Sequence, residues 1–141
     1  MERAAQTLEE FRVPYERCTL SSDSQRNYAK AAAPRGLKTL VVGVDRGAMV
    51  AGRLASQTSL PVIGVPLVRS HRHALKPLLL SVQNSHHGSV AMVAMNNATN
   101  AALFAVQCLA VGDPRLERAL RIYKRRLAFS NRQADRQLQS S

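Results

Sequence analysis

The chain has 141 residues and a mass of 15.4 kDa, the size of one ordinary domain, and 45% of its residues are hydrophobic, which excludes a chain disordered throughout. Its longest run without a charge, Pro77–Gly112, is interrupted by Ser, Gln, Asn and His, so no segment is apolar enough to span a bilayer. The first residues are acidic and polar where a secretory signal is apolar. Cys18 and Cys108 lie far apart and predict reduced thiols in a cytoplasmic protein.

The charge balance is strongly basic. Twenty basic residues, sixteen of them Arg, stand against nine acidic ones and give a formal net charge of +11. Such a balance favours anionic partners, although an oligomer interface or a basic proteome also explains it. The few aromatic residues do not alternate with the basic ones as a base-stacking surface requires. We therefore expect a small, anionic or nucleotide-like ligand and do not expect binding to nucleic acid.

The first half of the chain alternates helical and extended patterns. Hydrophobic periodicity and turn residues predict, in chain order, a helix over Met1–Phe11, a short strand over Tyr15–Leu20, a turn at Ser21–Ser24 capping a helix that runs to about Ala33, a strand over Thr39–Val44 and a helix over Arg46–Gln57. The run Thr39–Val44 is apolar and β-branched, which is typical of a strand buried on both faces.

The second half repeats the alternation. It predicts a strand over Pro61–Pro66, a helix over His71–Val82, a strand over Val90–Met95, an apolar helix over Asn97–Val111 and a last helix that begins at Asp113-Pro114, followed by a polar tail, 130–141, that we expect to be frayed. Strands alternating with helices predict an α/β fold with a parallel sheet, in a domain over residues 1–129. The Asn97–Val111 helix has almost no polar face, which in so small a chain predicts a subunit interface and hence a homo-oligomer.

Three stretches, Leu60–Pro66, Ser81–Gln83 and Met95–Leu103, together resemble the class I PurE family, the aminoimidazole ribonucleotide carboxylases and N5-carboxyaminoimidazole ribonucleotide mutases. The last stretch is most similar to the carboxylase end of fungal two-domain enzymes. The match continues through Glu9–Glu16, Tyr28–Lys30, Arg35–Lys38 and Gly112–Pro114. The resemblance implies a three-layer sandwich with a parallel, flavodoxin-like sheet, assembled as an octamer whose last helix reaches neighbouring subunits. It also implies carboxyl movement on 5-aminoimidazole ribonucleotide without metal or organic cofactor.

The resemblance marks seven pocket positions, which we take as candidate substrate-binding residues: Ser21, Ser22, Gly43, Arg46, Gly47, Ala48 and Gln83. The chain departs from the family at the residues that carry the chemistry. It starts inside the family's first helix, so the first strand and its phosphate-binding loop have no counterpart in it. The family's His-Arg-Thr-Pro tetrad is deleted after Ser22, and Met49 stands where a second histidine belongs. Because a thioether cannot carry a proton, we expect the ancestral reaction to be lost.

All four histidines lie in one region, and they are our candidate catalytic residues: His71, His73, His86 and His87. They form a rebuilt site for proton transfer, a metal site, or surface loops that have drifted. A His-x-His pair on a helix points its rings apart, so we expect no metal. If the chain is an enzyme, we expect a lyase or isomerase that uses histidine proton transfer without a cofactor.

Three functions therefore remain open. The first is a divergent PurE-family protein, either a pseudoenzyme that assembles with itself or a fold repurposed for another small-molecule reaction. The second is a purine-biosynthesis carboxylase or mutase whose site another chain completes. The third is a basic oligomer that binds anions or nucleic acid. The place of the absent first strand is also open: neighbouring strands close it, another chain fills it, or a longer gene encodes it.

Overall fold

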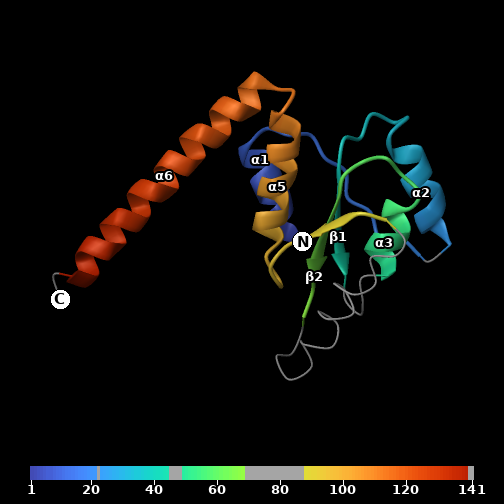
Figure 1. Ribbon diagram of the computed structural model, residues 1–141, viewed down its shortest axis with the longest axis horizontal. Helices are drawn as coiled ribbons and strands as arrows, with labels where there is room; N and C mark the ends of the chain where they lie inside the picture. Colours follow the sequence, from blue (N-terminus) through green and yellow to red (C-terminus); the bar gives the residue numbers. More distant parts are fainter. Residues whose placement is uncertain (22, 45–48, 69–87, 140–141) are drawn as a thin grey trace.

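The computed structural model describes residues 1–21, 23–44, 49–68 and 88–139 (Figure 1). Its elements, in chain order, are α1 (Glu2–Glu10), α2 (Ser24–Ala32), β1 (Leu40–Val44), α3 (Met49–Ala55), β2 (Val62–Pro66), β3 (Val90–Met92), α5 (Ala98–Ala110) and α6 (Pro114–Gln139). The helix predicted over 71–82 lies outside the described residues. Each described element except the tail of α6 falls on a segment for which the sequence predicted the same type.

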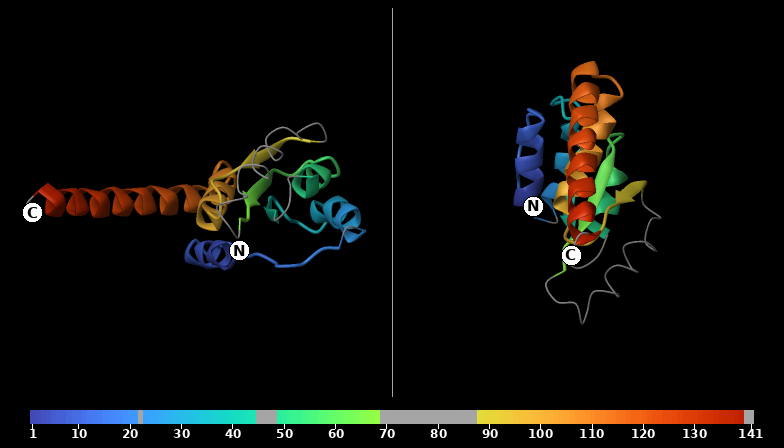
Figure 2. Two further views of the ribbon diagram at one scale, coloured as in Figure 1. Left: turned by 90° about the horizontal axis from the view of Figure 1, so that it is seen from below. Right: turned by 90° about the vertical axis from the view of Figure 1, so that its left-hand side faces the viewer.

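The strands form one parallel sheet in the order β1-β2-β3. Leu40 lies opposite Val62 in the β1–β2 pair, and Val62 lies opposite Val90 in the β2–β3 pair. Helices α1 and α5 cover one face of this sheet, and α2 and α3 cover the other (Figure 2). This arrangement confirms the predicted α/β class and the flavodoxin-like, three-layer sandwich with a parallel sheet.

Small side chains let α5 lie close to both the sheet and α1. Its buried residues are mostly alanines, and they pack with Ala4 of α1 against Ile63 and Val65 of β2. Asn97 starts the helix, since its side-chain oxygen accepts the backbone N–H of Asn100 at 3.0 Å. The predicted apolar helix is therefore only partly buried. Its alanine side lies in the core, whereas Phe104 is 38% exposed.

Helix α6 begins on the body of the molecule and then leaves it. Leu116 and Leu120 are buried with Phe11 and Val106, and the ring of Tyr123 lies 5.5 Å from that of Phe11. Arg126 then pairs with Glu10 of α1 at 4.0 Å, and beyond this pair the helix extends away from the other elements, as Figures 1 and 2 show. Apolar side chains on α6 are correspondingly exposed: Ile122, Leu127 and Phe129.

Two predictions about secondary structure were wrong. Tyr15–Leu20 is extended backbone rather than a strand, because none of the described strands pairs with it. The tail that we expected to be frayed is helical as far as Gln139. Its Arg, Gln, Ala and Leu residues favour helix, and adding residues to an existing helix is far easier than starting a new one.

Candidate functional site

In an open parallel sheet, ligands bind beyond the carboxyl ends of the strands. Here β1 ends at Val44 and β2 at Pro66, so the chain leaves this edge through residues 45–48 and 69–87. Most of the candidate residues belong to those two segments or to position 22, and they lie outside the described residues: Ser22, Arg46, Gly47, Ala48, His71, His73, Gln83, His86 and His87. Their roles remain predictions, while Ser21 and Gly43 can be placed.

Ser21 forms the turn that starts α2. Its backbone oxygen accepts the N–H groups of Ser24 at 3.2 Å and Gln25 at 3.3 Å, and its hydroxyl lies 3.0 Å from that of Ser24. These bonds satisfy the first donors of the helix, which have no partner within it. Ser21 is exposed at the start of this helix, so its hydroxyl is accessible to a ligand while its backbone already has a structural role.

Gly43 lies within β1, one residue before its carboxyl end. A Cβ atom built on it would lie 3.0 Å from Cδ1 of Leu67 and 3.2 Å from the Cγ and Sδ atoms of Met1. Any larger residue would therefore force these side chains to move. Close packing is thus a sufficient reason for glycine at this position, apart from any contact with a ligand.

Asn96 stabilises the backbone at the same edge of the sheet, although it is not among the residues that the sequence predicted to be functional. Its side chain accepts the N–H of Val68 at 2.9 Å and donates to the Val68 carbonyl at 3.0 Å, while its own N–H donates to the carbonyl of Pro66 at 2.8 Å. Its φ of 56° is left-handed, a conformation that Asn tolerates better than most residues. Asn96 thereby fixes the backbone where the chain leaves β2 toward the segment that holds the histidines.

A polar cluster joins the extended segment after α1 to α2. The hydroxyl of Tyr28 donates to Glu16 at 2.7 Å, the Arg35 guanidinium pairs with the same carboxylate, and Arg35 also lies 5.7 Å from the centre of the Tyr28 ring. Burial, followed by hydrogen bonds to Glu16 and Cys18, raises the pKa of the Tyr28 phenol. The hydrogen bond from Tyr28, reinforced by Arg35, lowers the pKa of Glu16. Tyr28 therefore stays neutral and Glu16 stays ionised, so this cluster stabilises the structure and is not suited to proton transfer.

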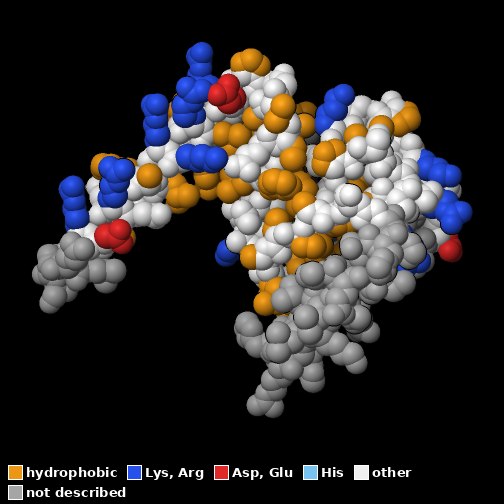
Figure 3. Space-filling view, viewed as in Figure 1, with side chains coloured by type: hydrophobic (Ala, Val, Ile, Leu, Met, Phe, Trp, Pro, Cys, Tyr) orange, Lys and Arg blue, Asp and Glu red, His pale blue; other side chains and the backbone are white. Residues whose placement is uncertain are grey.

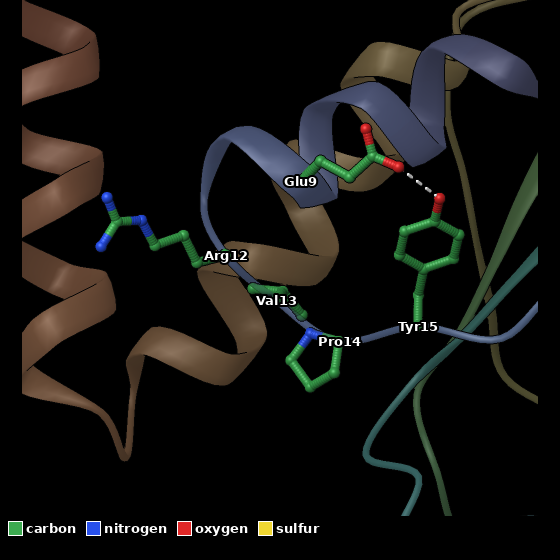
Figure 4. A pocket seen from close by; sticks show the side chains of 5 residues that line it. All are labelled: Glu9, Arg12, Val13, Pro14 and Tyr15. Atoms are coloured by element: carbon green, nitrogen blue, oxygen red, sulfur yellow. Dashed lines mark hydrogen bonds between the residues drawn. The ribbon is translucent and has the colours of Figure 1, made fainter.

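A shallow surface pocket of about 480 Å³ lies at the other end of the molecule, where α1 ends (Figure 4). Its lining residues are Glu9, Arg12, Val13, Pro14 and Tyr15. The Tyr15 hydroxyl donates to Glu9 at 2.6 Å, and this bond raises the pKa of Tyr15. Tyr15 and Glu9 therefore bond to each other across the pocket, and none of the candidate residues contributes to it.

The described residues offer no group of three or more His, Cys, Asp or Glu side chains that could hold a metal ion. Cys18 and Cys108 are free thiols, as predicted. Among the segments that the structure describes, no helix is both long and apolar enough to cross a membrane.

Comparison with known proteins identifies the family. The family model "AIR carboxylase" matches residues 1–129. The chain is 41% identical over 127 residues to the N5-carboxyaminoimidazole ribonucleotide mutase of Pyrococcus horikoshii, covering 87% of this chain and 72% of that protein. It is 39% identical to the mutase of the same name from Thermotoga maritima, covering 90% and 77%.

A two-domain relative gives the same answer. The chain is 40% identical over 124 residues to the phosphoribosylaminoimidazole carboxylase of Schizosaccharomyces pombe, covering 85% of this chain but only 22% of that larger protein. This similarity agrees with the resemblance to fungal carboxylases in the Met95–Leu103 stretch. With the parallel α/β fold and a family match over most of its length, the chain belongs to the AIR carboxylase, or PurE, family.

Proposed function

We propose that this chain keeps the scaffold of the PurE family and does not, by itself, move a carboxyl group on 5-aminoimidazole ribonucleotide. The observation that supports this proposal is the start of α3. Met49 is the first residue of that helix, just beyond the carboxyl end of β1, at the position where the family resemblance places a histidine. A proton relay at the ring is worth about 10²–10⁴-fold in rate, and a thioether cannot supply one.

The histidine loop supports the same proposal. In the family this loop follows the two serines that match Ser21 and Ser22, whereas here Asp23 follows directly and serves as the N-cap residue of α2. No imidazole occurs within residues 1–21, 23–44, 49–68 and 88–139. The four histidines of the chain all fall in 69–87, so a rebuilt proton-transfer site would depend on that segment alone.

The direct test is a turnover assay with the purified chain and N5-carboxyaminoimidazole ribonucleotide, using an intact mutase as positive control. We expect no product above the uncatalysed rate, and a Met49→His variant should remain inactive because the tetrad after Ser22 is still missing. Product formed by the unmodified chain contradicts the proposal. If activity were found, replacing His86 and His87 together by Ala would show whether the chain has rebuilt an acid–base site.

A second candidate function is favoured by the relatives themselves, whose names are mutase and carboxylase. In this version the chain works in purine biosynthesis, and a partner chain or an upstream segment supplies the strand and phosphate loop that the family has before the region matched here. The assay separates the two candidates, since this one predicts turnover only when the completing chain or segment is present.

We further propose that the chain is a cytoplasmic homo-oligomer, with the family's octamer as the expected form. The support is apolar surface at the end of α5 and along α6, where orange side chains lie between blue ones (Figure 3). Val111, which follows α5, is 91% exposed, and Phe129 of α6 is 65% exposed. A Leu127→Glu variant should lower the mass in solution, whereas Gln133→Glu, which adds the same charge to the same helix, should not. A monomeric unmodified chain contradicts this proposal. We also propose that the PurE-like domain ends at residue 129 and that a polar tail follows it, within the same helix α6.

A further inference from the structure

Helix α6 carries more than half of the net positive charge of the chain. It has eight basic residues and two acidic ones, so it contributes +6 to the formal net charge of +11. Figure 3 shows blue Lys and Arg side chains along the length of this helix. The positive charge is therefore concentrated on one element that extends away from the others.

Five exposed arginines of α6 lie on one face of the helix. Successive residues of an α-helix are about 100° apart, which places these five within an arc of about 60°. We call them the arginine ridge: Arg118, Arg121, Arg125, Arg132 and Arg136. Leu116 and Leu120, which are buried against the body of the protein, lie on the opposite side of the helix. The ridge therefore faces outward, and at 1.5 Å per residue it is about 27 Å long.

Carboxylates neutralise little of this ridge. Within the part of the chain that the structure describes, Arg121 is the one ridge residue with an ion pair, to Glu117. Arg121 and Arg125 are four residues apart, as are Arg132 and Arg136, and like charges at this spacing destabilise a helix. An anionic partner would remove this repulsion.

A second copy of the chain is not a suitable partner for the ridge. The chain has only nine acidic residues, and six of them already bond to described side chains. Each added copy also brings a formal net charge of +11. Leu127, which we propose as an oligomer contact, lies on the opposite side of α6. The ridge is therefore free for a partner that carries many negative charges of its own.

A membrane surface fits this helix poorly. Helices that lie on membranes have one broad apolar face. Leu127 and Phe129 are the large exposed apolar residues on the described part of α6 beyond Arg126, and they are two residues apart, so they lie on different sides of the helix. The basic residues of α6 are arginines with one exception, Lys124, and a guanidinium forms two parallel hydrogen bonds with a phosphate group.

We propose that the arginine ridge binds the phosphate groups of duplex DNA, with the outer part of α6 in the major groove. This groove is about 12 Å wide, and an α-helix with its side chains is about 10–12 Å across. The outer part of α6 projects from the other elements, so the body of the protein does not obstruct its entry (Figures 1 and 2). We expected no nucleic-acid binding because base-stacking aromatic residues are few, but phosphate contacts to a duplex do not require them. This inference does not depend on the proposed function.

Fluorescence anisotropy with a labelled duplex DNA of 20 base pairs and arbitrary sequence tests the inference. The purified chain is titrated into the duplex at several salt concentrations between 50 and 200 mM. Five neutralised phosphates predict a slope of about −4.5 for log affinity against log salt, which is a loss of roughly 500-fold in affinity over this range.

Two triple variants with the same net charge separate the ridge from the overall charge. The ridge variant combines Arg125→Gln, Arg132→Gln and Arg136→Gln. The control variant neutralises three exposed basic residues on or near α2, by Arg26→Gln, Lys30→Gln and Lys38→Gln. We expect the ridge variant to make the salt slope shallower by about 2.7 and to weaken binding at 100 mM salt by at least about tenfold. The control variant should change the slope by less than 1. Circular dichroism should show unchanged helix content in both, because Arg, Lys and Gln have similar helix propensities.

Four results would overturn the inference. The first is no binding by the unmodified chain, and the second is an affinity that does not change with salt. The third is equal weakening by the two variants, which would assign the effect to net charge alone. The fourth is equal or tighter binding to polyglutamate, to vesicles that contain phosphatidylserine, or to an RNA duplex of the same sequence, whose deep, narrow major groove does not admit a helix.

Discussion

Gly88 fixes the position at which the chain returns from residues 69–87 to the sheet, and its replacement by alanine tests that packing. A Cβ atom at this position would lie 2.7 Å from the backbone N of Ser56, and 2.8 Å from both the carbonyl carbon and the Cβ of Ala55, at the end of α3. Two of these three atoms belong to the backbone, so no side-chain rotation relieves the overlap. Overpacking of this kind costs about 1–3 kcal/mol.

Thermal unfolding followed by circular dichroism measures the effect. With about 4 °C of melting temperature per kcal/mol for a domain of this size, Gly88→Ala should lower the midpoint by roughly 4–12 °C. Gly112→Ala is the matched control, because a Cβ there meets nothing within 4 Å and its φ is not positive. This control should leave stability unchanged or raise it slightly. Equal midpoints for the two variants would refute the packing of Gly88 against α3.

Three further predictions concern single side chains. Asn96→Ala should cost about 2 kcal/mol in denaturant unfolding, from two lost bonds to Val68 and a left-handed φ that alanine tolerates poorly, whereas Asn96→Gly should cost less. Because its folded pKa is lowered, Glu16 stabilises the chain above its unfolded pKa and loses this effect as pH falls through the folded one. Glu16→Gln should therefore flatten the stability–pH curve below the ordinary value of 4.5, and an unchanged curve contradicts the Tyr28 contact. Asp113→Ala should cost about 1 kcal/mol, since its Oδ1 caps the start of α6, and no loss would contradict that cap.

The sequence was informative wherever local chemistry determines the structure. The apolar runs at β1 and β2 predicted strands, of which β2 is buried throughout and β1 only in part. Asn97 and Asp113 marked helix starts that the structure shows. These signals depend on residues near one another in the chain. The strand prediction for Tyr15–Leu20 failed because a strand needs a second strand to pair with, and the described sheet provides none beside this segment.

The candidate site was less accessible to sequence reasoning. Gly43 was chosen as a pocket position, but its contacts with Met1 and Leu67 come from segments distant in the chain. The role of Asn96 likewise depends on Val68, and the only local signal was an asparagine just before a helix cap, where a left-handed residue is common. Contacts of this kind arise from the fold and cannot be read from spacing.

The central claim is that the chain kept the family scaffold and lost the chemistry. A single-turnover experiment tests it most directly. The purified chain is in excess over N5-carboxyaminoimidazole ribonucleotide, and product is followed until all of the substrate has decayed in the buffer control. The account predicts a time course identical to that of buffer. A burst of carboxylated product from the unmodified chain would contradict it.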